Sequence, residues 1–259
     1  MIGVIAGDII GSRHEYIETK TTDFPLFQEA SRFTDDTVLT VATAHAILTG
    51  VPYGEAYRDF GRRYPAADYG GRFYEWLKSD DPRPYESWGN GSAMRVAPVG
   101  LAFSTVDDVL REAERSAAVT HDHPEGVKGA QATALAVFLA RTGASKDEIR
   151  DELAARFDYD LWRSVDEIRP DYEYHVSCQR SVPESIIAFL DSRDVEDAIR
   201  LAISLGGDAD TMAAIAGGIA HAFYRQVPRP IEQGARARLP ADLLAVVDAF
   251  ERAYPLAAS

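Results

Sequence analysis

Two segments far apart in the chain place acidic and hydroxyl side chains inside apolar surroundings. The segment "SLGGDADTMAAIAGG", residues 204–218, contains Asp208, Asp210 and Thr211. The segment "FTDDTVL", residues 33–39, contains Thr34, Asp35, Asp36 and Thr37. Asp and Thr are preferred at helix N-termini, where they accept hydrogen bonds from free N–H groups and complement the helix dipole. Helix capping is therefore a sufficient explanation of either segment taken alone.

The two segments together point to different chemistry. A cap needs one acceptor, whereas each segment offers two carboxylates and a threonine hydroxyl, and unpaired carboxylates in apolar surroundings are costly. Mg²⁺ and Mn²⁺ favour such oxygen ligands, and carboxylates can bridge two ions about 4 Å apart. We therefore interpret the two segments as the two halves of one divalent-metal site.

Three further segments carry candidate functional groups. In "GDIIGSRHEY", residues 7–16, Glu15 is a candidate general base, although a loop Glu is most often solvated. That segment lacks the G-K-[ST] ending of a nucleoside-triphosphate loop. In "GNGSAMRVAP", residues 89–98, several N–H groups could bind an anion such as a diphosphate, or the segment could be a tight turn. In "THDHPEG", residues 120–126, we expect His121 to contact a ligand or cap a helix, since the spacing of a zinc-binding pair is absent.

The elements that position these groups are predicted to be helical. Helical periodicity extends over residues 35–50, 52–64, 106–119, 125–143, 145–157, 195–205 and 240–254. The segment "YEYHV", residues 172–176, is the best candidate for a strand, and it is short and isolated. We predict an all-α fold.

Two segments are rich in small residues and are predicted to be central helices. "GDADTMAAIAGGIAHAF" is rich in Ala and Gly on every side, which is typical of a helix with close neighbours. "MIGVIAGDIIG" has Gly3, Gly7 and Gly11 at intervals of four, so that one helix face is smooth enough for close backbone approach.

Composition limits the classes of function. The 259 residues contain no linker or repeat, so we expect one domain over residues 1–259. The net charge of −14 disfavours non-specific binding to nucleic acid or a membrane surface. Cys178 is the single cysteine, and the apolar start lacks a basic region and contains Asp8. These features favour a cytoplasmic protein without a signal peptide or membrane helix.

Taken together, five segments resemble the ADP-ribosylglycohydrolase family, which includes dinitrogenase-reductase-activating glycohydrolase. The segments are "GDIIGSRHEY", "FTDDTVLTVATAHAIL", "GNGSAMRVAPVGL", "THDHPEGVKGAQATA" and the long segment from "SVPESIIAF" through "GGDADTMAAIAGGIAHAFY". They occur in the family's order and extend over residues 1 to about 228.

The resemblance implies a compact, single-domain orthogonal helical bundle with a centre of two Mg²⁺ or Mn²⁺ ions. It also implies hydrolysis of the glycosidic bond between ADP-ribose and an acceptor, with an ADP-ribosylated protein or small molecule as the substrate. By position in the motifs, the implied metal ligands are Thr34, Asp35, Asp36, Asp208, Asp210 and Thr211. Glu15 matches an acidic residue that is catalytic in some members, and the implied substrate-binding residues are Asn90, Gly91, Ser92 and His121.

The chain departs from the family pattern at one motif. Many members have Asp-Ile-Gly-Asn where this chain reads "ADYGGRF", residues 67–73. Asp68 is the candidate for that Asp, and the Asn is absent, so the acid that moves the proton is either Glu15 or Asp68. The motifs do not specify the acceptor, the choice between Mg²⁺ and Mn²⁺, the oligomeric state or the role of residues 158–176.

Three alternatives explain part of the pattern. A non-catalytic ADP-ribose-binding module would retain the same ligand-binding residues without turnover. A metal-dependent nucleotide phosphohydrolase would use a His-Asp doublet with further His ligands, and His121-Asp122 has no obvious His partners here. A purely structural helical protein would leave the matched Thr/Asp clusters unexplained.

Overall fold

The computed structural model describes residues 1–256, and these form one all-helical domain. The helices of its first half are α1 (Ile2–Gly11), α2 (Asp35–Thr49), α3 (Tyr53–Arg63), α4 (Gly71–Lys78), α5 (Gly91–Met94), α6 (Ala97–Ala102), α7 (Val106–Ala117) and α8 (Pro124–Thr142). Those of its second half are α9 (Lys146–Phe157), α10 (Val165–Ile168), α11 (Cys178–Asp191), α12 (Val195–Ile203), α13 (Ala209–Tyr224), α14 (Arg229–Arg236) and α15 (Ala241–Ala253). The predicted all-α class is confirmed.

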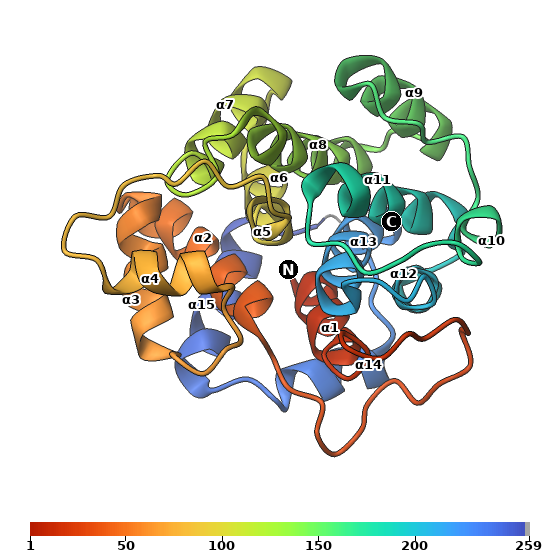
Figure 1. The fold of residues 1–259 in the computed structure, drawn as a ribbon, viewed down its shortest axis with the longest axis horizontal. Coiled ribbons are helices and arrows are strands. Elements are labelled where there is room, and N and C mark those ends of the chain that lie inside the picture. The colour runs from red at the N-terminus through yellow and green to blue at the C-terminus, as the bar shows by residue number, and fades with distance from the viewer. Residues whose placement is uncertain (257–259) are drawn as a thin grey trace.

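The helices α1 and α13 lie side by side near the centre of the molecule (Figure 1). The predicted glycine face of α1 is the contact surface. A Cβ atom added at Gly7 would lie 2.1 Å from the carbonyl oxygen of Ala213, and one at Gly11 would lie 2.5 Å from Cα of Asp210. Only glycine permits this approach, which brings the C-terminal turns of α1 against the N-terminal turn of α13.

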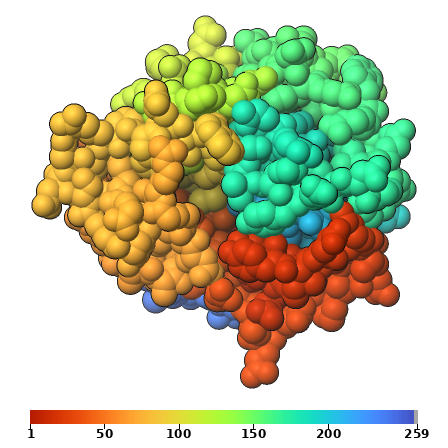
Figure 2. Space-filling view, in the orientation of Figure 1, coloured from red at the N-terminus to blue at the C-terminus, as the bar shows by residue number. Residues whose placement is uncertain are grey.

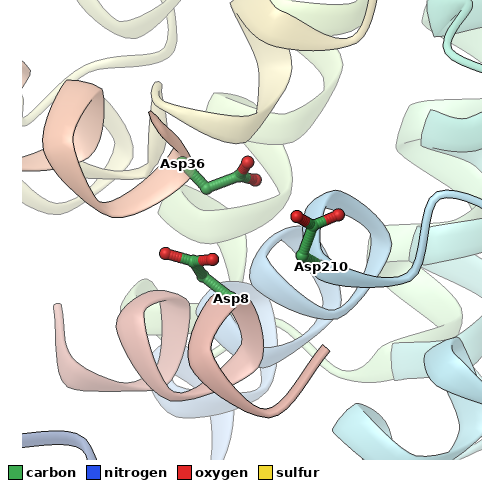
Figure 3. Close-up of side chains that lie close together, drawn as sticks. All are labelled: Asp8, Asp36 and Asp210. Atoms are coloured by element: carbon green, nitrogen blue, oxygen red, sulfur yellow. The ribbon is translucent and has the colours of Figure 1, made fainter. Parts of the chain in front are cut away.

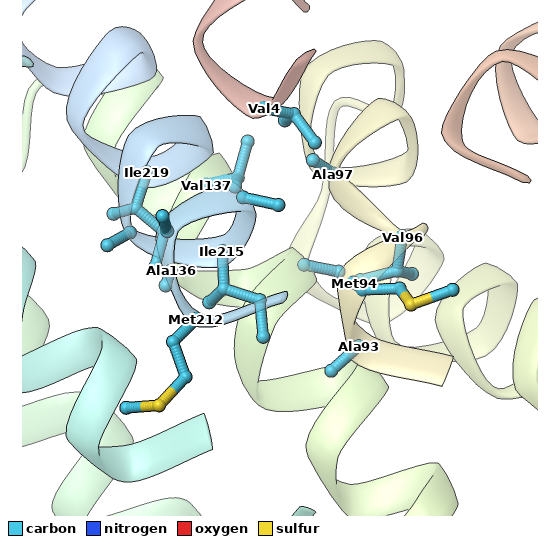
Figure 4. Close-up of a cluster of buried hydrophobic side chains, with 14 of the residues drawn as sticks. Val4, Ala93, Met94, Val96, Ala97, Ala136, Val137, Met212, Ile215 and Ile219 are labelled. Carbon is cyan, nitrogen blue, oxygen red and sulfur yellow. The ribbon is translucent and has the colours of Figure 1, made fainter. Parts of the chain in front are cut away.

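The apolar core surrounds this central pair. Figure 4 shows Val4 of α1, Ala97 of α6, Val137 of α8 and Ile215 of α13 in one buried cluster. The helices α8, α11 and α12 also pack on α13, so that α13 is buried along nearly its whole length. This burial holds the N-terminus of α13 in a fixed place.

The ranges predicted as helices are confirmed, with ends that differ by a few residues. The short helices α4, α5, α6, α10 and α14 were not predicted, and neither was α11. Pro183 lies inside α11 and interrupts the pattern of a helix, because proline lacks the N–H that the helix would use. The strand-like segment 172–176 forms no strand: within residues 1–256 the isolated bridge between Gly89 and Ser177 is the β-type pairing there.

Two expectations from composition concern membrane-spanning helices and the cysteine. Among the residues that the structure describes, every helix is too short or too polar to cross a lipid bilayer. Cys178 is buried and carries a free thiol at the start of α11.

Candidate metal centre

Three helices bring carboxylates together at the centre of the molecule. Asp8 of α1, Asp36 of α2 and Asp210 of α13 point toward one another in Figure 3, and one oxygen of each lies within 4.8 Å of the others. Glu15, Asp208 and Asp210 form a second group by the same distance. Asp210 belongs to both groups. Because the first group contains Asp36 of one motif and Asp210 of the other, the two motifs that sequence analysis paired meet in space.

The N-termini of α2 and α13 both open onto this cluster. Thr34 is the N-cap of α2, and its hydroxyl accepts a hydrogen bond from the N–H of Asp36. Asp208 is the N-cap residue of α13, but its side chain makes no capping hydrogen bond. Capping therefore accounts for Thr34 and leaves the carboxylates of Asp208 and Asp36 unexplained.

Asp8 also belongs to the cluster, although sequence analysis did not select it as a site residue. Its carboxylate accepts hydrogen bonds from the backbone N–H of Thr34 at 3.0 Å and of Thr37 at 3.1 Å, and from both threonine hydroxyls. Burial raises the pKa of Asp8 to about 6, although these hydrogen bonds oppose the rise. Asp8 thus ties the C-terminal half of α1 to the first turn of α2. In the sequence, the one sign of this role is a carboxylate inside an otherwise apolar helix.

The cluster has a strong excess of negative charge. Burial, followed by repulsion from neighbouring carboxylates, raises the pKa of Asp35, Asp36 and Asp210 well above the usual value for aspartate. Among the ion pairs of residues 1–256, none joins these three to a Lys or Arg. Oxygen Oδ1 of Asp36 is buried without a hydrogen-bond partner. Such a group must be protonated or must bind a cation, and oxygen ligands of this kind fit a hard divalent ion.

The remaining residues of the two motifs complete this picture. The hydroxyl of Thr211 donates a hydrogen bond to Oδ2 of Asp36 at 3.3 Å, so it links α13 to α2. The hydroxyl of Thr34 lies 3.3 Å from the same oxygen. All six residues selected as metal ligands therefore lie at the two facing helix N-termini.

A cavity of about 430 Å³ opens above the cluster. In Figure 2 the surface is hollowed where the orange and yellow segment before α5, the teal segment before α11 and the red N-terminal segment meet. The acids Glu15, Asp35, Asp36, Asp208 and Asp210 line one part of the cavity, and aromatic side chains line much of the rest: Tyr16, Tyr69, Phe73, Tyr85, Trp88 and Tyr174. A hollow of this size with convergent polar groups is typical of a small-molecule site.

The two candidate acids differ in their surroundings. Glu15 is half-buried, and burial raises the pKa of its carboxyl, as does repulsion from Asp208. Asp68 lies on the exposed rim of the cavity with a left-handed backbone, φ 63°, and pairs with the guanidinium of Arg32 at 2.6 Å. Glu15 is therefore the acid next to the buried carboxylates, whereas Asp68 already has a cationic partner.

The glycine-rich segment before α5 borders the same cavity. The side-chain amide of Asn90 donates a hydrogen bond to Asp208 at 2.7 Å, which joins this segment to the acidic cluster. Gly91 and His121 line the cavity. Ser92 lies outside the lining, because its hydroxyl is buried and donates to the carbonyl oxygen of Gly126 at 2.6 Å.

The two residues that follow His121 make hydrogen bonds outside the acidic cluster. Asp122 accepts a hydrogen bond from the backbone N–H of Glu86, and the imidazole of His123 accepts one from Glu125 at the start of α8. Within residues 1–256, both acidic groups consist of carboxylates alone. The His-Asp doublet is therefore separate from the candidate metal centre.

Comparisons with known proteins agree with this geometry. The sequence model of the ADP-ribosylglycohydrolase family matches residues 1–257. ADP-ribosylhydrolase ARH3 of Mus musculus is 29% identical over 329 residues, covering 95% of this chain and 88% of that protein. ADP-ribosylarginine hydrolase Tri1 of Pseudomonas putida is 25% identical over 266 residues, covering 86% of this chain and 69% of that protein. A solved structure described as an ADP-ribosylglycohydrolase-related protein complex superposes with a TM-score of 0.76 at 25% identity, covering 98% of this chain and 95% of that one.

Proposed function

The chain belongs to the ADP-ribosylglycohydrolase family, and from this premise we propose that it is a divalent-metal-dependent hydrolase that releases ADP-ribose from an acceptor. The observation that carries the proposal is the pair of acidic groups that share Asp210 beneath one cavity, of whose members only Glu15 is partly exposed. We also propose that residues 1–259 act as one catalytic domain.

We propose two Mg²⁺ or Mn²⁺ ions as the cofactor. Asp35, Asp36, Asp208 and Asp210 would supply the carboxylate ligands, and Thr34 and Thr211 would supply oxygens at the two helix N-termini. The free oxygen Oδ1 of Asp36 supports this assignment, as does the lack of a Lys or Arg partner for these carboxylates within residues 1–256. When bound, the ions would offset the negative charge of the cluster and orient hydroxyl groups of the sugar.

The residues of the cavity suggest how they would act in the hydrolysis of a glycosidic bond. Glu15 is placed to take the proton of the attacking water, because a raised pKa makes its carboxylate a stronger base than an ordinary glutamate. Bond cleavage builds positive charge on the sugar, and the carboxylates below would stabilise this charge. Asp68 would be the alternative base, provided that Arg32 released it.

The part of the cavity beside the glycine-rich segment would receive the rest of ADP-ribose. We propose that Asn90 and Gly91 border the diphosphate, with His121 donating a hydrogen bond to it. The substrate would be an ADP-ribosylated protein or small molecule. The net charge of −14 makes a nucleic-acid acceptor the least favoured class.

Mass spectrometry of the products tests the proposal. The protein would be incubated with Mg²⁺ or Mn²⁺ and a panel of conjugates in which ADP-ribose is linked to arginine, to serine, to acetate or to a nucleic-acid end. We expect free ADP-ribose from at least one linkage and none in excess EDTA. Tight binding of ADP-ribose without release from any conjugate would instead favour a non-catalytic binding module, and release of phosphate from nucleotides would favour a phosphohydrolase.

A further inference from the structure

A buried arginine lies beside the cavity, and within residues 1–256 no carboxylate pairs with it. The side chain of Arg95 is 0% exposed, and its guanidinium lies over the ring of Tyr57 at 4.2 Å. Its Nη2 donates hydrogen bonds to the hydroxyl of Thr120 at 2.8 Å and to the carbonyl oxygen of Ser116 at 3.3 Å. A buried charge with so few partners is costly, which suggests a role beyond packing.

The hydroxyl of Thr120 connects Arg95 to His121. It lies 2.7 Å from Nδ1 of His121 and is fully buried. Arg95 can only donate, so the oxygen of Thr120 accepts from it. The hydroxyl proton of Thr120 then needs an acceptor, and among the contacts of residues 1–256 the one available is Nδ1 of His121. A neutral imidazole that accepts at Nδ1 carries its proton on Nε2.

The Nε2 side of this ring faces the glycine-rich segment. A Cβ atom placed on Gly91 would lie 3.1 Å from Nε2 of His121, and one placed on Gly89 would lie 3.7 Å from it. Nε2 makes no hydrogen bond to any residue in the described part of the chain, so its proton is available to a ligand in the cavity.

We propose that Arg95 is a positioning residue that acts through Thr120 to fix His121 as the neutral tautomer with its proton on Nε2, directed at an anionic group beside Gly89–Gly91. The anion would be the diphosphate of ADP-ribose, and in this respect the inference rests on the proposed function. The opposite tautomer would present a lone pair to the phosphate oxygens and repel them.

The charges around His121 are consistent with a neutral imidazole ring. Burial, and then the charges of Arg95 and Arg72, lower the pKa of His121 well below the usual value for histidine. Arg72 also lies with its guanidinium over the ring of Tyr85, 4.8 Å from its centroid, on the same side of the cavity. In the ligand-free protein the ring is therefore neutral, and its tautomer decides which nitrogen offers a proton to an anion.

Two variants of Thr120 separate the tautomer from the fold. Thr120→Val has nearly the same shape and lacks the hydroxyl, whereas Thr120→Ser retains it. The readout is the pair of ¹⁵N chemical shifts of His121 in the metal-loaded, ligand-free protein, which distinguish the two neutral tautomers. His121→Gln assigns the resonances.

We expect Thr120→Val to lose the uniform Nε2–H signature and to bind ADP-ribose about tenfold more weakly, as the loss of one hydrogen bond to a charged group implies. Its KM should rise while kcat stays near the wild-type value. Thr120→Ser should retain both the Nε2–H tautomer and the wild-type affinity for ADP-ribose. An unchanged Nε2–H tautomer in Thr120→Val would overturn the inference.

Arg95 itself is tested by Arg95→Lys, which retains the charge with a single donor group. We expect a mixture of tautomers in this variant, and if it does not fold the two Thr120 variants decide. A wild-type protein that shows the Nε2–H tautomer but does not bind ADP-ribose would support the relay and contradict the proposed function. A wild-type protein with its proton on Nδ1 would contradict the relay alone.

Discussion

Replacing Asp210 by Asn should change the thermal stability in opposite directions with and without metal. Asp210 is shared by both acidic groups, and Asn has the same size and can still accept the hydrogen bond from the N–H of Thr211. The substitution therefore removes a negative charge while the packing of α13 is retained. A purely structural Asp at a helix N-terminus would behave differently, because its loss would destabilise the protein in either condition.

The magnitude follows from the spacing of the carboxylates. Oxygens within 4.8 Å of one another imply a repulsion of roughly 3 kcal/mol per charged pair at an effective dielectric constant of about 20. Protonation relieves much of this repulsion, and the dipole of α13 favours a carboxylate at its N-terminus by about 0.3–1 kcal/mol. A net gain of about 1 kcal/mol in the metal-free variant would raise Tm by about 2–4 °C.

Metal should reverse the order of the two proteins. At a metal concentration about 100 times Kd, the wild type gains about 2.7 kcal/mol, which is a rise in Tm of about 5–10 °C. Asp210→Asn lacks the shared anionic ligand and should gain far less. Differential scanning calorimetry in EDTA and in excess Mg²⁺ or Mn²⁺ measures both shifts. Asp158→Asn, at an exposed position after α9, is the matched control and should follow the wild type. Equal destabilisation of Asp210→Asn in both conditions would refute the metal centre.

Three other variants test separate parts of the molecule. Glu15→Gln should lower kcat, measured by chromatography of released ADP-ribose, by about 10²–10⁴-fold, and the metal-dependent rise in Tm should be largely kept. Unchanged turnover would show that another group is the base, and Asp68 would be tested next. Gly7→Ala should cost about 1–3 kcal/mol in urea unfolding, because its Cβ would lie 2.1 Å from the carbonyl oxygen of Ala213, whereas Gly71→Ala, with open space around it, should be nearly neutral. Lys20→Met should destabilise the protein by about 1–3 kcal/mol and raise KM, because the ammonium group of Lys20 donates hydrogen bonds to the carbonyl oxygens of Arg169, Tyr172 and Leu205. These bonds hold the segment after Glu15 against the segment before Asp208. An equal effect of Lys78→Met, at an exposed position, would contradict this reason.

Much of the fold was predictable because its long helices have a clear periodicity. The glycine face of α1 was visible in the spacing of Gly3, Gly7 and Gly11, and the structure shows why it is needed, since α13 packs directly on it. The helix α11 was not predicted because Pro183 contradicts the local pattern, and tertiary packing overrides this local preference. The short α5 and α10 contain too few residues for a period to be read.

The candidate site was predictable where two motifs share a composition, and less so where a residue acts through others. The match between "TDDT" and "DADT" indicated a common site, although 175 residues separate Asp36 and Thr211, which the fold brings into hydrogen-bond contact. Asp8 was missed because its role depends on the first turn of α2, which no local pattern connects to it. Ser92 was selected through the family resemblance, and the structure shows that its hydroxyl already donates to the carbonyl oxygen of Gly126.

The most direct test of the central claim is the metal-dependent release of ADP-ribose, measured by mass spectrometry on the wild type and Asp210→Asn side by side. We predict that the wild type releases ADP-ribose from at least one conjugate with Mg²⁺ or Mn²⁺, and that EDTA or the substitution abolishes the release. Full release by the wild type in excess EDTA, or by Asp210→Asn with metal, would contradict the claim that the shared acidic cluster binds the catalytic metal.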